Sequence, residues 1–108
     1  MRWILCVVLV VVAASFAHQP RHINAVPDEV TAVKIAERVL TGIYGKKIID
    51  SEKPFTATLT NGVWHVGGTL YCNDEHGVRI AGAGCRGGVA MAEIKQSNGR
   101  ILRTEHGR

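Results

Sequence analysis

The sequence has little of the material from which nucleic-acid interfaces and deep ligand pockets are built. It contains only two tryptophans, two tyrosines and two phenylalanines, and none of them lies within a run of lysine or arginine residues. Single-stranded nucleic acids are bound by aromatic side chains that stack on bases inside a basic groove. The basic residues, 13 against 9 acidic ones, are instead scattered, which favours solubility and a weak preference for acidic partners. We therefore expect no nucleic-acid partner.

A catalytic constellation is also missing. Ser51 and Ser97 lie in turn-like polar stretches, and not at the sharp strand-to-helix turn that carries a hydrolase nucleophile. Cys85 with His65 or His76 is a better candidate pair, but a disulfide bond would consume the thiol. The few aromatic residues also leave little material for the apolar pocket that a buried catalytic carboxylate requires. No catalytic residue is therefore assigned.

Cofactor and metal motifs fail on their sequence context. Residues 82–87 have the spacing of a dinucleotide-binding G-x-G-x-x-G loop, which works only between a strand and the N-terminus of a helix. Residues 88–92 have the pattern of a strand instead. His18 and His22 lie near a terminus, where histidines are usually solvated rather than bound to metal. The sequence thus predicts no cofactor and no metal site.

The first residues, 1–17, have the pattern of a signal peptide. Arg2 supplies a positive start, residues 4–14 are apolar without interruption, and Ser15 and Ala17 are the small residues of a cleavage site. The apolar run of about 11 residues is too short for a membrane span, which needs about 20. We expect cleavage after Ala17 and export, with no membrane attachment afterwards. An uncleaved anchor is the alternative.

Three cysteines are present, and cleavage would remove Cys6. Cys72 and Cys85 would then remain in an oxidising compartment, which predicts a disulfide bond between them. Closing a loop of this length contributes roughly 3 kcal/mol in the chain-entropy model. Two free thiols are the alternative, and zinc is less favoured because no second pair of ligands lies close by.

The predicted N-terminal half is a flexible lead-in, residues 18–26, followed by one helix. Residues 27–29 read Pro-Asp-Glu, a typical helix start, and Gly45 is a natural stop. Between them, apolar residues recur at three- and four-residue steps: Val33, Ala36, Leu40 and Ile43. Tyr44 is expected at the edge of the core. Residues 46–51 are interpreted as a short edge strand because of Ile48 and Ile49.

A tight hairpin is the strongest local signal of the chain. Residues 55–59 alternate apolar and threonine side chains, and Asn61-Gly62 suits the two positive-φ positions of a type I′ turn. Such a turn sets the register, with the opposed pairs Leu59–Trp64 and Ala57–Val66. One face of the hairpin is then apolar and needs a helix to cover it.

Further strands complete an α+β layer. We expect a strand over residues 63–72 to pair antiparallel with one over 88–95, and a last strand to follow the turn at 97–99. The predicted fold class is α+β, with one N-terminal helix packed on a curved antiparallel sheet of four to five strands. Residues 27–108 would form this single domain.

The polar and glycine-rich stretch between the two cysteines is the candidate binding site. A loop constrained by a disulfide, with acids at one end and guanidinium groups at the other, is suited to enter a partner's cleft. Ordinary solvated loop charge is the alternative. The candidate partner-binding residues are Asn73, Asp74, Glu75, His76, Arg79 and Arg86.

The order and spacing of several short motifs resemble bacterial immunity proteins with a nuclear-transport-factor-two-like fold. The matching stretches are the run from Ala36-Glu37 to Tyr44-Gly45, then Pro54-Phe55, Gly-Val-Trp-His-Val-Gly-Gly-Thr-Leu at 62–70, Gly-Gly-Val-Ala at 87–90, Glu93-Ile94, and Asn-Gly-Arg-Ile-Leu at 98–102. The resemblance covers nearly the whole predicted mature domain. The stretch bracketed by Cys72 and Cys85, and the signal peptide, depart from it.

The resemblance implies a non-enzymatic protein that binds and inhibits a cognate toxin of a polymorphic or type VI secretion system. Because the chain is expected to be exported, the implied place is the periplasm, and the implied toxin is a cell-wall-degrading effector such as a peptidoglycan amidase. The alternatives are a periplasmic inhibitor of a lysozyme or protease outside toxin immunity, or a small-ligand-binding module of the same fold. A monomer and a homodimer both stay open.

Overall fold

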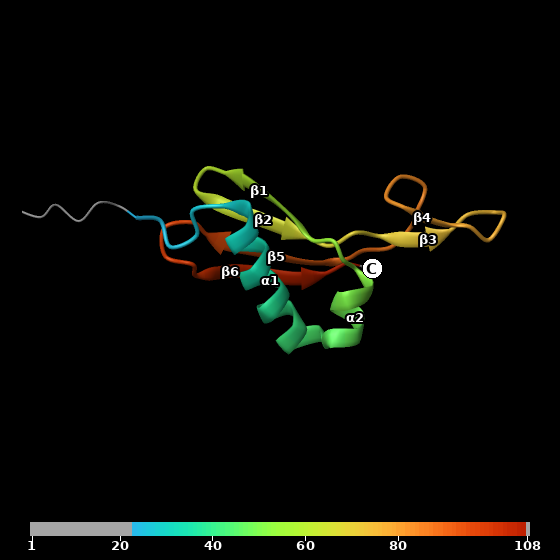
Figure 1. The fold of residues 1–108 in the computed structure, drawn as a ribbon, viewed down its shortest axis with the longest axis horizontal. Coiled ribbons are helices and arrows are strands. Elements are labelled where there is room, and N and C mark those ends of the chain that lie inside the picture. Colours follow the sequence, from blue (N-terminus) through green and yellow to red (C-terminus); the bar gives the residue numbers. More distant parts are fainter. Residues whose placement is uncertain (1–22, 108) are drawn as a thin grey trace, which may run out of the picture.

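The computed structural model describes residues 23–107, so the predicted signal peptide lies outside the described residues and stays a prediction. The helices are α1 (Glu29–Tyr44) and α2 (Lys46–Ser51), and the strands are β1 (Thr56–Thr60), β2 (Val63–Gly67), β3 (Tyr71–Asn73), β4 (Arg79–Ala81), β5 (Ala90–Lys95) and β6 (Ile101–His106). A four-stranded antiparallel sheet has the order β1-β2-β5-β6, and β3 and β4 form a separate two-stranded sheet. Helix α1 lies across one face of the larger sheet (Figure 1). This confirms the predicted α+β class.

Helix α1 begins and ends at the residues that the sequence indicated. Asp28 is the N-cap, and its Oδ1 accepts a hydrogen bond of 2.8 Å from the backbone N–H of Thr31. Pro27 precedes this cap and is not part of the first turn. At the other end, Gly45 has φ +94° and donates its N–H to the carbonyl oxygen of Thr41. The predicted helix is thus confirmed, with both ends set by local chemistry.

Acid is expected to weaken this N-cap. The hydrogen bond from Thr31 lowers the pKa of the Asp28 carboxyl group from its ordinary value. A carboxyl group whose pKa is lower in the folded state contributes stability above its unfolded pKa of about 3.9, and this contribution is lost as the pH falls through the folded value. Asp28→Asn keeps a capping oxygen that does not titrate, so the variant should lose less stability than the wild type between pH 5 and pH 2, a window of about three units around that pKa. Urea unfolding at each pH measures this, and parallel pH profiles would contradict it.

The predicted hairpin is confirmed in its register. Leu59 lies opposite Trp64 and Ala57 opposite Val66, while Asn61 and Gly62 both have positive φ, +49° and +74°. Leu59 is nevertheless 42% exposed. The apolar face of the hairpin is therefore only partly covered at its turn end.

The core forms where α1 meets β2 and β5. Trp64 and Val66 of β2 alternate with outward-facing residues, and Ala92 and Ile94 of β5 lie opposite them in the register. The buried apolar side chains come from both layers and the lead-in: Val26, Ala32, Ala36, Leu40, Ile49, Phe55, Trp64, Val66, Ala90, Ala92 and Ile94. Tyr44 is partly buried against this cluster, as expected for an edge-of-core residue.

The lead-in predicted over residues 18–26 is held by the domain at its last residues. The N–H groups of Ala25 and Val26 donate to the carbonyl oxygens of Ser97 and Gln96, at 3.2 and 3.0 Å. Val26 is fully buried, and its own carbonyl oxygen accepts a 2.8 Å bond from Trp64 Nε1. Two residues assigned to the lead-in therefore belong to the fold.

The edge strand expected at residues 46–51 is wrong, because these residues form α2. Gly45 redirects the chain after α1, and the side chains of Lys46 and Asp50 then pair one helical turn apart. Ile49 is fully buried and Ile48 is 45% exposed. Two adjacent isoleucines therefore point to different environments, which a short helix and a strand can both achieve. The apolar pair alone does not distinguish them.

The long strand expected over residues 63–72 is also wrong. It ends at Gly67, after pairing from Val63↔Lys95 to Gly67↔Met91. The chain leaves the sheet because the N–H of Thr69 is bonded at 2.7 Å to the carbonyl oxygen of Glu52, outside the ladder. The residues that follow pair with each other in a hairpin of their own.

Candidate partner-binding arm

Residues 69–89 form an arm that extends beyond the end of the four-stranded sheet, carrying β3 and β4 (Figure 1). The two strands pair antiparallel, Tyr71↔Ala81 through Asn73↔Arg79. A backbone hydrogen bond from Gly82 to the carbonyl oxygen of Leu70, 2.9 Å long, continues the ladder by one step. All six predicted partner-binding residues lie on this arm.

The tip of the arm is ordered by one carboxylate. Asp74 Oδ1 accepts bonds of 2.9 and 2.8 Å from the backbone N–H groups of His76 and Val78, and its own N–H bonds the carbonyl oxygen of Val78. This is a side chain closing its own turn, as aspartate commonly does. Asp74 is therefore a structural residue of the tip. Asn73, Glu75 and His76 are exposed around it.

The two arginines lie on different parts of the arm. Arg79, in β4, places its guanidinium 4.1 Å from the centre of the Tyr71 ring, a cation–π contact that fixes its position. Arg86 is exposed on the segment that returns to β5. Sequence reasoning missed Tyr71 and also Val78, which is 58% exposed near the tip. Tyr71 pairs with Ala81 and Arg79 with Asn73, so Tyr71 and Arg79 are diagonal neighbours across the hairpin. Their contact could be inferred only once β3 and β4 were recognised.

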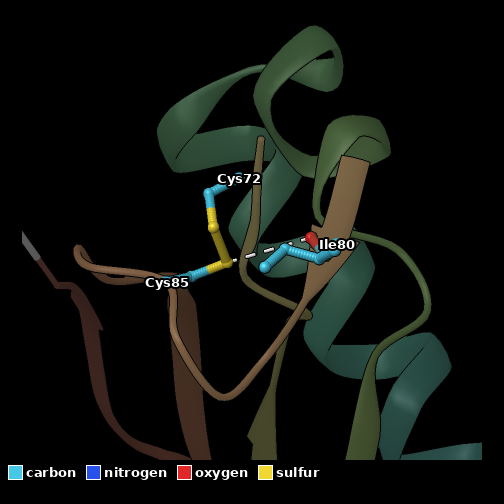
Figure 2. The surroundings of a disulfide bond; sticks show 3 residues. All are labelled: Cys72, Ile80 and Cys85. Atoms are coloured by element: carbon cyan, nitrogen blue, oxygen red, sulfur yellow. Dashed lines mark hydrogen bonds between the residues drawn. A yellow bond between two sulfur atoms is a disulfide. The ribbon is translucent and has the colours of Figure 1, made fainter. Parts of the chain in front are cut away.

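The predicted disulfide is present between Cys72 in β3 and Cys85 after β4, with 5.5 Å between their Cα atoms. The sequence also predicts that this bond clamps the base of a hairpin made by residues 63–72 and 88–95. That placement is wrong, because the bond closes the arm internally. Figure 2 shows Cys85 Sγ beside the carbonyl oxygen of Ile80, 3.8 Å away. A disulfide sulfur carries no proton to donate, so this is a packing contact. The bond ties the return segment to both strands of the arm.

The remaining sequence motifs have structural explanations. Residues 82–87 are turn and coil that lead to strand β5, so this G-x-G-x-x-G stretch does not precede the helix N-terminus that a dinucleotide-binding loop uses. His65 faces away from α1, and its Nδ1 lies 3.6 Å from Glu93 Oε1, which also lies 3.7 Å from Arg103 Nε. Within residues 23–107 there is no cluster of three or more histidine, cysteine or acidic side chains that could hold a metal ion.

A polar groove runs between α1 and α2 on the helix side of the molecule. Its lining residues are Lys34, Glu37, Arg38, Thr41, Lys46, Asp50 and Lys53. Lys53 Nζ lies 3.1 Å from Asp50 and 3.8 Å from Glu37, and the hydrogen bond from Lys46 lowers the pKa of Asp50. Much of the charge in this groove is therefore neutralised internally.

Among the helices of residues 23–107, none is long and apolar enough to cross a membrane.

Helix α1 on a four-stranded antiparallel sheet, with the short helix α2 and a protruding arm, is an α+β arrangement consistent with the NTF2-like class. The family described as "NTF2 fold immunity protein" matches residues 31–108, and the chain belongs to it. It is also 34% identical over 85 residues to "Uncharacterized protein YhhH" of Escherichia coli (strain K12), a match that covers 79% of this chain and 59% of that protein. The chain thus spans about three-fifths of the length of this curated relative. No solved structure matches it. Toxin immunity is the general function that the family supports.

Proposed function

We propose that this chain is a non-enzymatic immunity protein of the periplasm, which binds a cognate cell-wall-degrading toxin through the arm of residues 69–89. The family supports toxin immunity in general. The exported location is inferred from the signal-peptide pattern of residues 1–17. An exported inhibitor is useful only against a toxin that acts outside the cytoplasm, which favours a wall hydrolase as the target.

The geometry of the arm carries the proposal. It extends past the sheet, closed by a disulfide and ordered at its tip by Asp74. A prefolded projection with exposed charged and apolar side chains can enter a concave active site at a small entropic cost, because little ordering is left to be done on binding.

Co-expression tests the function directly. Effectors encoded beside this gene would be sent to the periplasm, with and without this protein, and survival would be scored. We expect one of them, a wall hydrolase, to be neutralised only by the exported protein, and a form lacking residues 1–17 should not protect. Protection by the form retained in the cytoplasm would contradict the periplasmic location. Protection against a lysozyme or protease with no effector gene nearby would favour the alternative inhibitor function.

Removing both arginines of the arm should weaken toxin binding. Arg79→Ala combined with Arg86→Ala is expected to cost more than about 1 kcal/mol, roughly a fivefold or greater rise in Kd, because interface arginines are frequent anchors. Isothermal titration with the neutralised effector measures this.

The control for that pair is Lys34→Ala combined with Arg100→Ala. Both residues are exposed and lie outside the arm, so the control makes the same change in net charge. It should leave the Kd within about twofold. Equal losses in the two double variants would mean that the arginines act only through long-range charge, and no loss in either would place the interface elsewhere.

A further inference from the structure

Glu52 lies between α2 and β1 and is 8% exposed. Among the polar and charged residues of 23–107, it is the buried one. Its Oε1 accepts a 2.6 Å bond from the backbone N–H of Ala90, and its Oε2 lies 3.2 Å from His106 Nε2. Its backbone carbonyl oxygen accepts the 2.7 Å bond from Thr69. Thr69 and Ala90 are the positions where the arm leaves the sheet and returns to it. One residue therefore bonds both ends of the arm.

The neighbours of Glu52 add further contacts at the root of the arm, meaning the place where Thr69 leaves the sheet and Ala90 returns to it. Thr69 Oγ1 donates to the carbonyl oxygen of Pro54, and the Tyr71 hydroxyl donates to that of Lys53, each at 2.7 Å. Gly68 packs so closely that a Cβ there would lie 3.0 Å from the Cβ of Glu52. Residues 52–54 thus contact Gly68, Thr69 and Tyr71, where the chain leaves the sheet and enters the arm. The disulfide, by contrast, lies within the arm and does not bond it to the domain.

A carboxylate at this place is not explained by packing alone. Burying a charged group is costly unless its oxygens are fully bonded, and an apolar side chain of similar volume would often be as stabilising. Both oxygens of Glu52 do have partners, and His106 Nδ1 in turn lies 2.8 Å from the carbonyl oxygen of Gly107. The Tyr44 ring packs edge-on against His106, with 5.2 Å between ring centres. These contacts hold the carboxylate in one orientation, aimed at Ala90.

We propose that Glu52 is a positioning residue that sets the direction of the arm relative to the sheet, so that the arm meets its toxin already aligned. This rests on the proposed function of the arm in toxin binding. Its physical basis is that the root is ordered in the free protein, and the cost of ordering it is not paid on binding. Glu52 itself lies at the root, away from the exposed tip. Its carboxylate acts through Ala90, and its backbone carbonyl holds Thr69.

Two substitutions separate this role from simple stability. Glu52→Ala removes the acceptor for Ala90 and the partner of His106. Glu52→Gln keeps an acceptor for Ala90, and its amide can donate to a neutral His106 Nε2, so it should largely restore the root. Ile94→Val is the matched control, since Ile94 is fully buried in β5 and lies outside the arm, and the change costs stability without touching the root.

Order at the root is measured first, on the protein alone, by amide hydrogen exchange and ¹⁵N relaxation. In Glu52→Ala we expect exchange at Ala90, which loses its carboxylate acceptor, to rise at least about tenfold and the arm amides to lose order, with Val66 and Ile94 unchanged. Exchange at Thr69 should rise less, because its N–H keeps the backbone carbonyl acceptor of residue 52. Glu52→Gln and Ile94→Val should keep the arm as ordered as in the wild type. Should Glu52→Ala fold poorly, Tyr71→Phe removes a root hydrogen bond from a half-exposed side chain and should loosen the same amides to a smaller extent.

Affinity is measured second, for the effector that wild-type protein neutralises. Glu52→Ala should bind about tenfold more weakly, with Glu52→Gln and Ile94→Val near the wild type. An arm that stays ordered in Glu52→Ala and Tyr71→Phe overturns the positioning role, whatever the affinity. A loosened arm with unchanged affinity overturns it as well. If the root loosens as expected but the wild type binds no adjacent effector, Glu52 positions the arm and the proposed function of the arm fails.

Discussion

Trp64→Ala is expected to lower the free energy of unfolding by about 3–5 kcal/mol. Trp64 is 7% exposed in β2 and belongs to the cluster between α1 and the sheet. Its removal leaves a large cavity in a small core, and it also leaves the carbonyl oxygen of Val26 without the 2.8 Å bond from the indole N–H. That second loss is costly because Val26 is fully buried. Urea unfolding followed by circular dichroism measures the change.

Trp64→Phe separates the two contributions of this side chain. The ring still fills most of the space, but the N–H donor is gone, so we expect a loss of about 1–3 kcal/mol, the penalty of an unsatisfied buried carbonyl group. The segment around Val26 should then exchange its amide protons faster than the sheet does. A cost below about 1 kcal/mol for Trp64→Ala would mean that this face of the hairpin is not the core.

Removing the disulfide, by Cys72→Ser with Cys85→Ser, should destabilise the arm by roughly 3 kcal/mol in the chain-entropy model. The two cysteines are 13 residues apart, and the arm has few buried side chains to compensate, since most of residues 73–87 are exposed. We therefore expect the arm to open locally while the larger sheet persists. The amide protons of Gly82 and of position 85 should exchange faster in this variant, and toxin binding should weaken in parallel.

The matched measurement is on the sheet of the same variant. Amides of β2 and β5 should keep their protection, because their hydrogen bonds and the core cluster lie outside the loop that the disulfide closes. Loss of protection throughout the molecule would show that the arm and the sheet unfold as one unit. An arm as protected as in the wild type would show that its root and tip contacts suffice without the covalent bond.

Local rules explain which predictions were confirmed. Helix α1 is delimited by the chemistry of Asp28 and Gly45, and the hairpin register follows from the Asn61-Gly62 turn. Each depends on contacts between residues close in sequence, so each can be inferred from a short window. The buried position of Trp64 follows from the same alternation.

The wrong predictions concern segments whose structure is decided by distant residues. The sequence predicts a strand through residues 63–72 that pairs with residues 88–95, but Thr69 is bonded to Glu52 and leaves the sheet. The short segment at 46–51 carries an apolar pair that suits either helix or strand. Its packing against the neighbouring helix α1, and not the pattern itself, selects the helix. Glu52 was not singled out because nothing in its immediate sequence distinguishes it from a solvated turn residue.

The sequence by itself determined helix α1, the tight hairpin, the pairing of Cys72 with Cys85 and the family resemblance, because each depends on neighbouring residues or on an even count of cysteines. Only the tertiary structure decided that the stretch between the cysteines is an arm separate from the sheet, and that Glu52 bonds both of its ends. Those features depend on atoms brought together from positions 38 residues apart, such as Glu52 and Ala90. Contacts over such separations leave no periodicity in the chain from which they can be inferred.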